Sequence, residues 1–380
     1  MFRNYRFKNY NFRLVAFVVA LTIYGIIIIG SANEDYQNKQ IIGMVLGVIV
    51  MVAVSMIDYS TILSFSWLLY AMAVIALALI KSPLGYSSHE ATRWIRIGGI
   101  QFQPSEMAKV FLILFFAAYL LKYADTLNTR KRLLITVILA LIPLMLIVIE
   151  PDLSTTVVTF LVIFTMLFYA GLSAKLTGAL VGIGAIGIAG VIFLTLHSSG
   201  VLQGYQNERI AAWLQPDKYP SSSMQQQNSI MAVGSGMLFG KGLSNTGADS
   251  VKNGNYIPEP HTDFIFAVTG EEVGFLGTVL MMVLIFGIVF ECLRTAKKAK
   301  DLAGQLICVG MASLVAFQAF VNISVVTGLM PNTGLTLPFV SYGLTSLVTL
   351  YFGIGFVLNV SIQSKKFYGD ERNLTFDLKK

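Results

Sequence analysis

The chain of 380 residues is 55% hydrophobic and only 12% charged, with a mean hydropathy of +0.71. A soluble globular protein carries about 25% charged residues, so lipid rather than water must surround most of this chain. The formal charge of +7 fits Lys and Arg retained on the cytoplasmic side of a membrane protein, and we exclude nucleic acid as a partner. The two cysteines, Cys292 and Cys308, are too few for a disulfide framework or a four-thiolate metal site.

Long apolar runs predict an all-α polytopic membrane protein with about ten transmembrane helices, at roughly 20 residues per crossing. In chain order the predicted segments are 14–31, 40–57, 61–80, 104–121, 132–149, 154–171, 174–196, 264–290, 302–328 and 341–362. We expect a single transmembrane domain over 1–380, with a long extracellular loop over about 197–262 and a tail over about 363–380. Any chemistry must then sit on membrane helices and their loops.

Four clusters of Lys and Arg fall on one side of an alternating ten-helix path. They are Arg3, Arg6, Lys8 and Arg13; Lys122, Arg130, Lys131 and Arg132; Arg294, Lys297, Lys298 and Lys300; and Lys365, Lys366 and Arg372. The positive-inside rule assigns that side, with both termini, to the cytoplasm. The outer face then receives the turn Glu150-Pro151-Asp152, a loop over about 81–103 and the long segment over 197–262.

Glu106 and Lys109 are an oppositely charged pair at the predicted outer end of the fourth helix. Pro104 suits the first turn of that helix, and a spacing of three residues places both charged side chains on one helix face. An ionisable residue within a span costs roughly 2.5 to 3.5 kcal/mol on insertion scales and therefore indicates a specific role. Two interpretations stay open: an ion pair that fixes helix packing, and a charged wall of an outward-facing cavity.

Asp263 lies where a polar loop, stiffened by Pro258 and Pro260, meets the eighth apolar segment. Thr262 or Asp263 is expected to be the N-cap of that helix. A carboxylate near membrane depth, beside His261, can also have its pKa raised by desolvation toward the range useful for a general base. The two roles are compatible, because a capping residue is rigidly mounted.

Positive charge also gathers in the outer loops. Arg93, Arg96, Arg209 and Lys241 could hold a phosphorylated ligand there, or lie in solvent or among lipid headgroups. The glycines around Lys241 do not complete a G-x-x-x-x-G-K-[ST] loop, which excludes ATP chemistry of that type. The three histidines lack metal-ligand spacing, so we expect no protein zinc site.

Two further segments are unusual for a membrane span. Glu271 and Glu272 fall inside the eighth helix, where they must face protein or a cavity, and we expect them to form hydrogen bonds between helices. The loop over 328–343 is rich in Gly and Pro yet apolar. Irregular backbone at membrane depth is found only where protein or a water-filled cavity covers it. This loop is therefore predicted to be re-entrant or tightly packed near the same cavity.

Several ordered motifs resemble the RodA/FtsW/SpoVE family of cell-shape, division and sporulation proteins, abbreviated SEDS. The motifs are Thr92-Arg93-Trp94-Ile95, Pro104 to Lys109, Glu150-Pro151-Asp152-Leu153, Gly240-Lys241-Gly242-Leu243, Pro258 to Phe266 and Leu337 to Gly343. The resemblance runs through most of the chain, and the RodA branch is the one it resembles most. Ser154 stands where the family usually has Gly.

The resemblance implies an inverting peptidoglycan glycosyltransferase that polymerises lipid II at the outer face of the plasma membrane, in cell elongation and shape. It implies that Asp263 is the essential carboxylate and that Glu106 and Lys109 form a functionally important pair. Asp263 would deprotonate the 4-hydroxyl of the acceptor's N-acetylglucosamine. That oxygen would attack the anomeric carbon of the donor's N-acetylmuramic acid and release undecaprenyl pyrophosphate, giving a β-1,4 bond.

A departing pyrophosphate needs positive charge. Arg93, Arg96, Arg209 and Lys241 are candidates, with His261 as a further substrate-binding candidate. A bound divalent cation, Mg²⁺ or Mn²⁺, is another source of charge, and no organic cofactor is expected. The resemblance also implies a class B penicillin-binding protein as partner. Two alternatives stay open: a flippase for lipid II or another lipid-linked sugar, and a non-catalytic scaffold of the cell-wall synthesis complex.

Overall fold

A computed structural model describes residues 7–82, 85–88, 91–97, 100–197, 204–244, 250 and 256–363. Its elements, in chain order, are η1 (Phe7–Asn9), α1 (Phe12–Ala32), α2 (Glu34–Ser55), α3 (Tyr59–Ser64), α4 (Ser66–Leu79), β1 (Gly85–Ser88), β2 (Ala91–Ile97), β3 (Ile100–Phe102), α5 (Pro104–Tyr123), η2 (Ala124–Thr126), α6 (Arg130–Ile149), α7 (Leu153–Tyr169), α8 (Ala174–His197), α9 (Gly204–Leu214), η3 (Pro216–Lys218), α10 (Pro220–Ser235), α11 (Ile265–Ala296), α12 (Leu302–Val326) and α13 (Leu344–Ile362).

Each of the ten predicted apolar segments coincides with a helix, except that the third is divided into α3 and α4. Among the described residues, seven helices are long and apolar enough to cross a membrane: α1, α2, α5 continued by η2, α6, α11, α12 and α13. The helices α4 and α7 are apolar but shorter. The helical membrane class is therefore confirmed, while ten crossings and cytoplasmic termini stay predictions.

The core lies where α12 and α13 pack against α2, α5 and α11. These helices bury large side chains such as Tyr351 of α13 and Phe115 and Phe116 of α5. The outward faces keep apolar side chains exposed, for example Ile49 of α2 and Phe286 of α11. Apolar residues both inside and outside are typical of helices that are surrounded by lipid.

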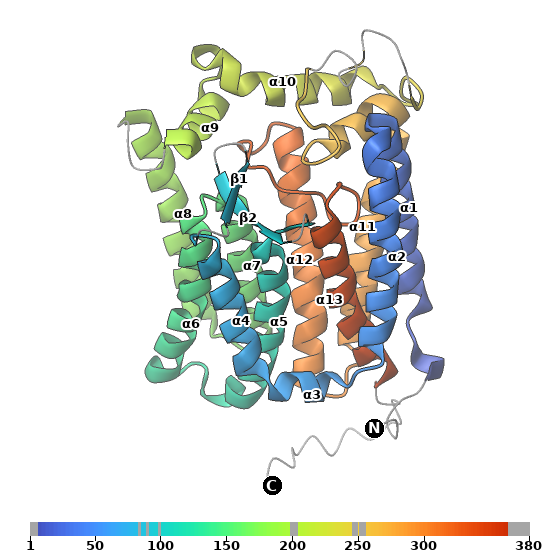
Figure 1. Cartoon of the computed structure of the whole chain (residues 1–380). Helices are drawn as coiled ribbons and strands as arrows, with labels where there is room; N and C mark the ends of the chain where they lie inside the picture. Colours follow the sequence, from blue (N-terminus) through green and yellow to red (C-terminus); the bar gives the residue numbers. More distant parts are fainter. Residues whose placement is uncertain are drawn as a thin grey trace.

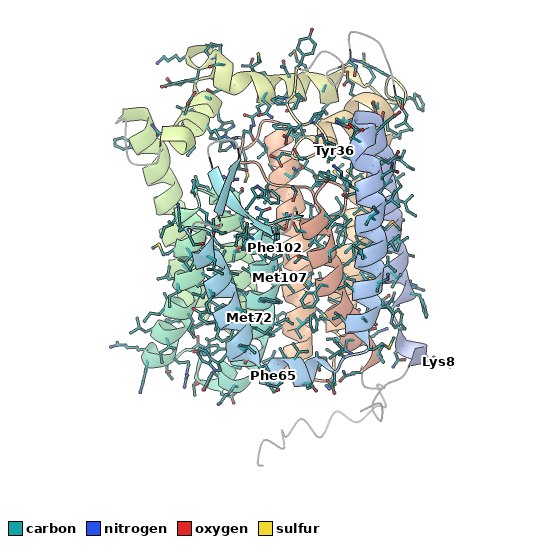
Figure 2. The ribbon with its side chains drawn as sticks, in the orientation of Figure 1. Lys8, Tyr36, Phe65, Met72, Phe102 and Met107 are labelled. Carbon is teal, nitrogen blue, oxygen red and sulfur yellow. The ribbon has the colours of Figure 1, made fainter. Side chains whose placement is uncertain are left out.

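The two ends of the bundle differ (Figure 1). The helices α9 and α10 lie across one end, and α3 with the described ends of the chain lies at the other. Figure 2 shows Lys8 and Phe65 near the α3 end and Tyr36 toward the α10 end. Both α9 and α10 fall inside the segment that we expected to be one long loop.

A three-stranded antiparallel sheet, in the order β1-β2-β3, forms within the predicted loop over 81–103. Tyr86 pairs with Trp94, and Ile95 pairs with Phe102. The expectation of an all-α protein is wrong in this one element. The strands are short and their alternation is irregular, with a register shift after Tyr86, so the apolar periodicity carries little strand signal.

The helix α11 is interrupted at Gly274, which has φ 74° and ψ −164°. The residues after α10 fill the gap: Lys241 donates its backbone N–H to Glu271 O, and Phe275 donates to Met237 O, at 2.9 and 2.8 Å. An L side chain is strained at this φ, so Gly permits the break. The helix also continues to Ala296, six residues beyond the predicted end.

Candidate active site

Asp263 precedes α11, whose N-cap is Phe264 and lacks a side-chain capping bond. The expectation that Thr262 or Asp263 caps this helix is therefore wrong. The backbone of Asp263 is held by another helix instead, because Asn322 Nδ2 of α12 donates to Asp263 O at 2.8 Å. The same amide donates to Leu335 O at 2.6 Å, so Asn322 joins Asp263 to the loop over 328–343.

Gly334, in that loop, is the point where the reactive groups meet. A Cβ placed on it would lie 3.2 Å from Asp263 Oδ2, 3.7 Å from Arg93 Nη1 and 3.8 Å from Arg209 Nη1. Its φ is +72°, a conformation that favours Gly. Residues from four separate parts of the chain therefore place one carboxylate and two guanidinium groups around a single small residue.

Both arginines are oriented by further contacts. Arg93 of β2 donates from Nη2 to Pro151 O at 2.6 Å, and its Nη1 lies 3.8 Å from Asp152 Oδ2. Arg209 of α9 donates from Nη1 to Asn332 O at 3.2 Å. Two guanidinium groups fixed in this way form a positively charged wall beside Asp263.

Asp152 links this wall to α7. Its side chain accepts the Thr155 backbone N–H at 3.0 Å and so caps the helix. Ser154 donates its hydroxyl to Asp152 Oδ1 at 3.1 Å and to Thr333 O at 3.3 Å. Ser154 is therefore a direct contact of the site.

Burial raises the pKa of Asp263 to about 6, against the opposing effect of the Arg209 and Arg93 charges. A pKa near neutrality suits a general base, because the group is ionised at pH 7 and still binds a proton well. Burial also raises the pKa of Glu150 to about 9, with the nearby Asp152 charge adding to the rise. Glu150 is therefore a neutral acid at pH 7.

The buried pair Glu106 and Lys109 connects three helices beneath the site. Lys109 Nζ donates to Glu106 Oε1 at 2.7 Å and to Gln318 Oε1 of α12 at 3.0 Å. Ser346 of α13 donates to Glu106 Oε2 at 2.9 Å, and Gln318 Nε2 donates to Thr336 O at 3.1 Å. These contacts support the first interpretation, an ion pair that fixes helix packing, and through Gln318 the pair also reaches the loop that carries Gly334. The second interpretation, a charged wall of an outward-facing cavity, stays a prediction.

The remaining predicted residues lie elsewhere. His261 is buried and stacks on Tyr36 with ring centroids 4.2 Å apart, and burial lowers the pKa of its imidazole. Lys241 Nζ lies 2.8 Å from Glu271 Oε1. Arg96 pairs with Gln101 in the sheet, and its side chain lies outside the described residues.

Glu272 forms the expected hydrogen bond between helices, because it accepts from Ser31 Oγ of α1 at 2.7 Å. Glu271 instead pairs with Lys241, in the segment that follows α10. The loop over 328–343 is packed as predicted, with Leu335, Leu337 and Phe339 buried. Among described residues, sequence reasoning missed Gln318 and Asn322, whose spacing of four on one helix face was the available signal.

The described carboxylate groups of the site do not form a binding site for a divalent cation by themselves. Within the described part of the chain, no three His, Cys, Asp or Glu side chains converge as metal ligands. Asp152 and Asp263 are the nearest candidates, and the guanidinium of Arg93 contacts the first and faces the second. The positive charge of Arg93 already lies between these two carboxylates, where a cation would have to bind. The described protein residues alone therefore do not fit a divalent cation.

These features define a multi-pass helical membrane protein with a buried carboxyl-guanidinium site at one end of its bundle. Sequence comparison gives the particular family. Residues 8–366 match the profile of the FtsW/RodA/SpoVE family, described as cell cycle protein. The chain belongs to this family.

Related proteins extend over nearly the whole chain. A probable peptidoglycan glycosyltransferase FtsW from Trichlorobacter lovleyi is 33% identical over 371 residues, covering 94% of each chain. Stage V sporulation protein E from Bacillus subtilis is 35% identical over 366 residues, covering 93% of this chain and 97% of its own.

Solved structures show the same fold. The rod shape determining protein RodA from Thermus thermophilus superposes with a TM-score of 0.70 at 27% identity, covering 95% of this chain and 98% of its own. A chain of a peptidoglycan synthase complex that coordinates polymerization and crosslinking gives a TM-score of 0.76 at 28% identity, covering 93% and 97%.

Proposed function

We propose that this protein is a peptidoglycan glycosyltransferase that polymerises lipid II at the outer face of the plasma membrane. Family membership and relatives named as probable peptidoglycan glycosyltransferases support the reaction class. The single observation that carries the assignment of the site is the convergence of Asp263, Arg93 and Arg209 at Gly334. It combines a base with positive charge for a phosphate leaving group, which is what this transfer requires.

In the proposed reaction, Asp263 takes the proton from the 4-hydroxyl of the acceptor's N-acetylglucosamine. The freed electron pair forms a bond to the anomeric carbon of the donor's N-acetylmuramic acid, and the bond from that carbon to the pyrophosphate breaks. Inversion gives a β-1,4 bond, and undecaprenyl pyrophosphate takes the leaving electron pair. One carboxyl suffices for this displacement, because the leaving group needs charge stabilisation rather than a proton.

Arg93 and Arg209 would stabilise the charge that develops on the pyrophosphate. Their guanidinium groups are oriented by Pro151 O and Asn332 O before substrate binds, so little reorganisation is needed. Any Mg²⁺ or Mn²⁺ would have to be held largely by pyrophosphate oxygens, and no step here depends on it. Lys241 is paired with Glu271, and we assign it a structural role in this proposal.

We further propose a role in cell elongation together with a class B penicillin-binding protein. The likeness to RodA supports the first part. The likeness to a chain from a complex that couples polymerization with crosslinking supports the second. The partner would crosslink the strands that this protein makes.

The test is polymerisation of labelled lipid II by the purified protein with its candidate partner and a divalent cation, under moenomycin to silence unrelated glycosyltransferases. We expect a glycan ladder from the wild type and none from Asp263→Asn, with folding and partner binding retained. Asp35→Asn, an exposed carboxyl at the start of α2, is the matched control and should behave as the wild type.

Other results would favour the alternatives. A ladder from both the wild type and Asp263→Asn would remove Asp263 as the required base. If neither made glycan while an active family member polymerised in parallel, transport of a lipid-linked sugar or scaffolding would be favoured. Lipid II transport that survived Asp263→Asn would then separate a flippase from a scaffold.

A further inference from the structure

A cavity of about 320 Å³ lies at the end of the bundle opposite Asp263. The residues that line it come from the segment leading into α1, the last turns of α11 and the end of α13. Figure 2 labels Lys8 at this end. The cavity therefore lies where the apolar surface of two predicted membrane helices meets a basic rim.

The charge of the cavity is strongly positive. Among the described residues, Lys8, Arg13, Arg294 and Lys298 line it, against one carboxylate, that of Glu291. That carboxylate is buried and already satisfied, because Asn11 Nδ2 donates to it at 3.0 Å and Arg294 Nη1 at 3.3 Å. Three of the four positive charges are thus left without a carboxylate within the described part of the lining.

The neighbouring surface is apolar. On α11, Phe286, Phe290 and Leu293 are 69%, 54% and 41% exposed, and their spacing places them on one face. This stripe ends beside Arg294, at the cavity mouth. Phe12, at the start of α1, is 70% exposed and lines the cavity itself. A ligand that fits both features has an anionic head and a long apolar chain.

We propose that this cavity binds the phosphate of an anionic phospholipid, with the acyl chains lying along α11. The chain's own C-terminal segment is a poor occupant, because the sequence after Gln363 holds five Lys or Arg against three Asp or Glu. Its charge has the same sign as the cavity. A phospholipid supplies both the negative charge and the apolar surface, and basic clusters at membrane surfaces recognise such headgroups.

The experiment is native mass spectrometry of the purified full-length protein in detergent, titrated separately with phosphatidylglycerol and phosphatidylcholine. The cavity variant is Arg13→Gln/Lys298→Gln, which changes two exposed residues. The control is Arg130→Gln/Lys131→Gln at the start of α6, which removes the same two charges from exposed positions in another predicted basic cluster. The readout is the apparent dissociation constant of the first bound lipid.

We expect the wild type to prefer phosphatidylglycerol. Each removed charge should weaken that binding about fivefold, so the cavity variant should lose about 25-fold and the control less than about twofold. Binding of phosphatidylcholine should not change. Equal losses in both variants, or no loss in the cavity variant, would overturn the proposal, because the effect would then be general surface attraction or absent.

Two further arms keep the result decisive. Inorganic phosphate at the lipid's own concentration should not displace phosphatidylglycerol, and displacement would overturn the lipid as the ligand. If Arg13→Gln/Lys298→Gln fails to fold, Lys8→Gln/Lys298→Gln replaces it, since Lys8 is also exposed. The same loss of about 25-fold is expected of that pair.

Discussion

Replacing Arg209 with Gln should move the acid limb of the polymerisation rate to higher pH. The proposed base, Asp263, has a pKa of about 6, and the Arg209 and Arg93 charges hold it below the value that burial alone would give. Removing one guanidinium removes part of that stabilisation of the carboxylate. The base should then need a higher pH to ionise.

The geometry sets the size of the shift. Arg209 Nη1 and Asp263 Oδ2 lie at most about 7 Å apart, because a Cβ placed on Gly334 would lie 3.8 Å from the first atom and 3.2 Å from the second. An opposite charge at 4 to 6 Å lowers a carboxyl pKa by roughly 1 to 3 units, and Arg93 remains in the variant. We therefore expect a rise of about one unit, to a pKa near 7. At pH 6 the ionised fraction would fall from about one half to about one tenth.

The assay is kcat/KM for lipid II polymerisation between pH 5 and pH 9, since that quantity reports the pKa of the free enzyme's base. Arg209→Lys is the matched variant, because it keeps the positive charge and should leave the limb near pH 6. Both variants can lose rate through weaker pyrophosphate binding, which lowers the whole profile without shifting it. A limb that stays near pH 6 in Arg209→Gln would refute the electrostatic argument.

Three other changes test the site. Gly334→Ala should lower polymerisation at least about tenfold, because its Cβ would lie 3.2 Å from Asp263 Oδ2 at a positive φ. Gly343→Ala in the same loop should be mild, since its nearest neighbour would be 3.6 Å away, and equal losses would contradict this account. Asn322→Leu should reduce the unfolding free energy by about 3 kcal/mol and lower kcat, because the carbonyl groups of Asp263 and Leu335 lose their hydrogen-bond donor. An unchanged Tm would contradict a stabilising role of these two hydrogen bonds. Glu150→Gln should stabilise the protein at pH 7 by up to about 3 kcal/mol, since the unfolded chain ionises Glu150 near pH 4.5 and the folded protein only near 9. Between these two pKa values the native state binds one more proton than the unfolded chain, so the stability of the wild type should fall as pH rises from 5 to 8. In thermal unfolding scans over this range, the Tm of the variant should change less with pH than that of the wild type. Parallel Tm profiles for the two proteins would contradict this expectation.

The helices could be predicted because a segment that crosses a membrane needs about 20 mostly apolar residues in a row, and such a run is visible in the sequence. The tenth apolar segment was expected over 341–362, and α13 occupies Leu344–Ile362. Asp263, Glu106 and Lys109 could likewise be selected, since ionisable groups are rare beside such segments. Two of the errors, the sheet of β1, β2 and β3 and the N-cap expected at Thr262 or Asp263, concern polar segments where no long apolar run guides the assignment.

The site itself depends on contacts that no local pattern contains. Gly334 meets Arg93, Arg209 and Asp263, which come from β2, α9 and the loop before α11. The sequence placed all four on the same face of the membrane, but composition cannot show which loops touch. Lys241 illustrates the limit, because it shared that face and yet pairs with Glu271.

The break in α11 at Gly274 changes what the membrane must accommodate. Below the break, residues 275–296 form a helix about 33 Å long, which already matches the hydrocarbon thickness of roughly 30 Å. Residues 265–273, with Glu271 and Glu272, then need not enter the hydrocarbon at all. Two carboxylates in mid-bilayer would cost roughly 6 kcal/mol on insertion scales, and the interruption lets α11 insert without that penalty.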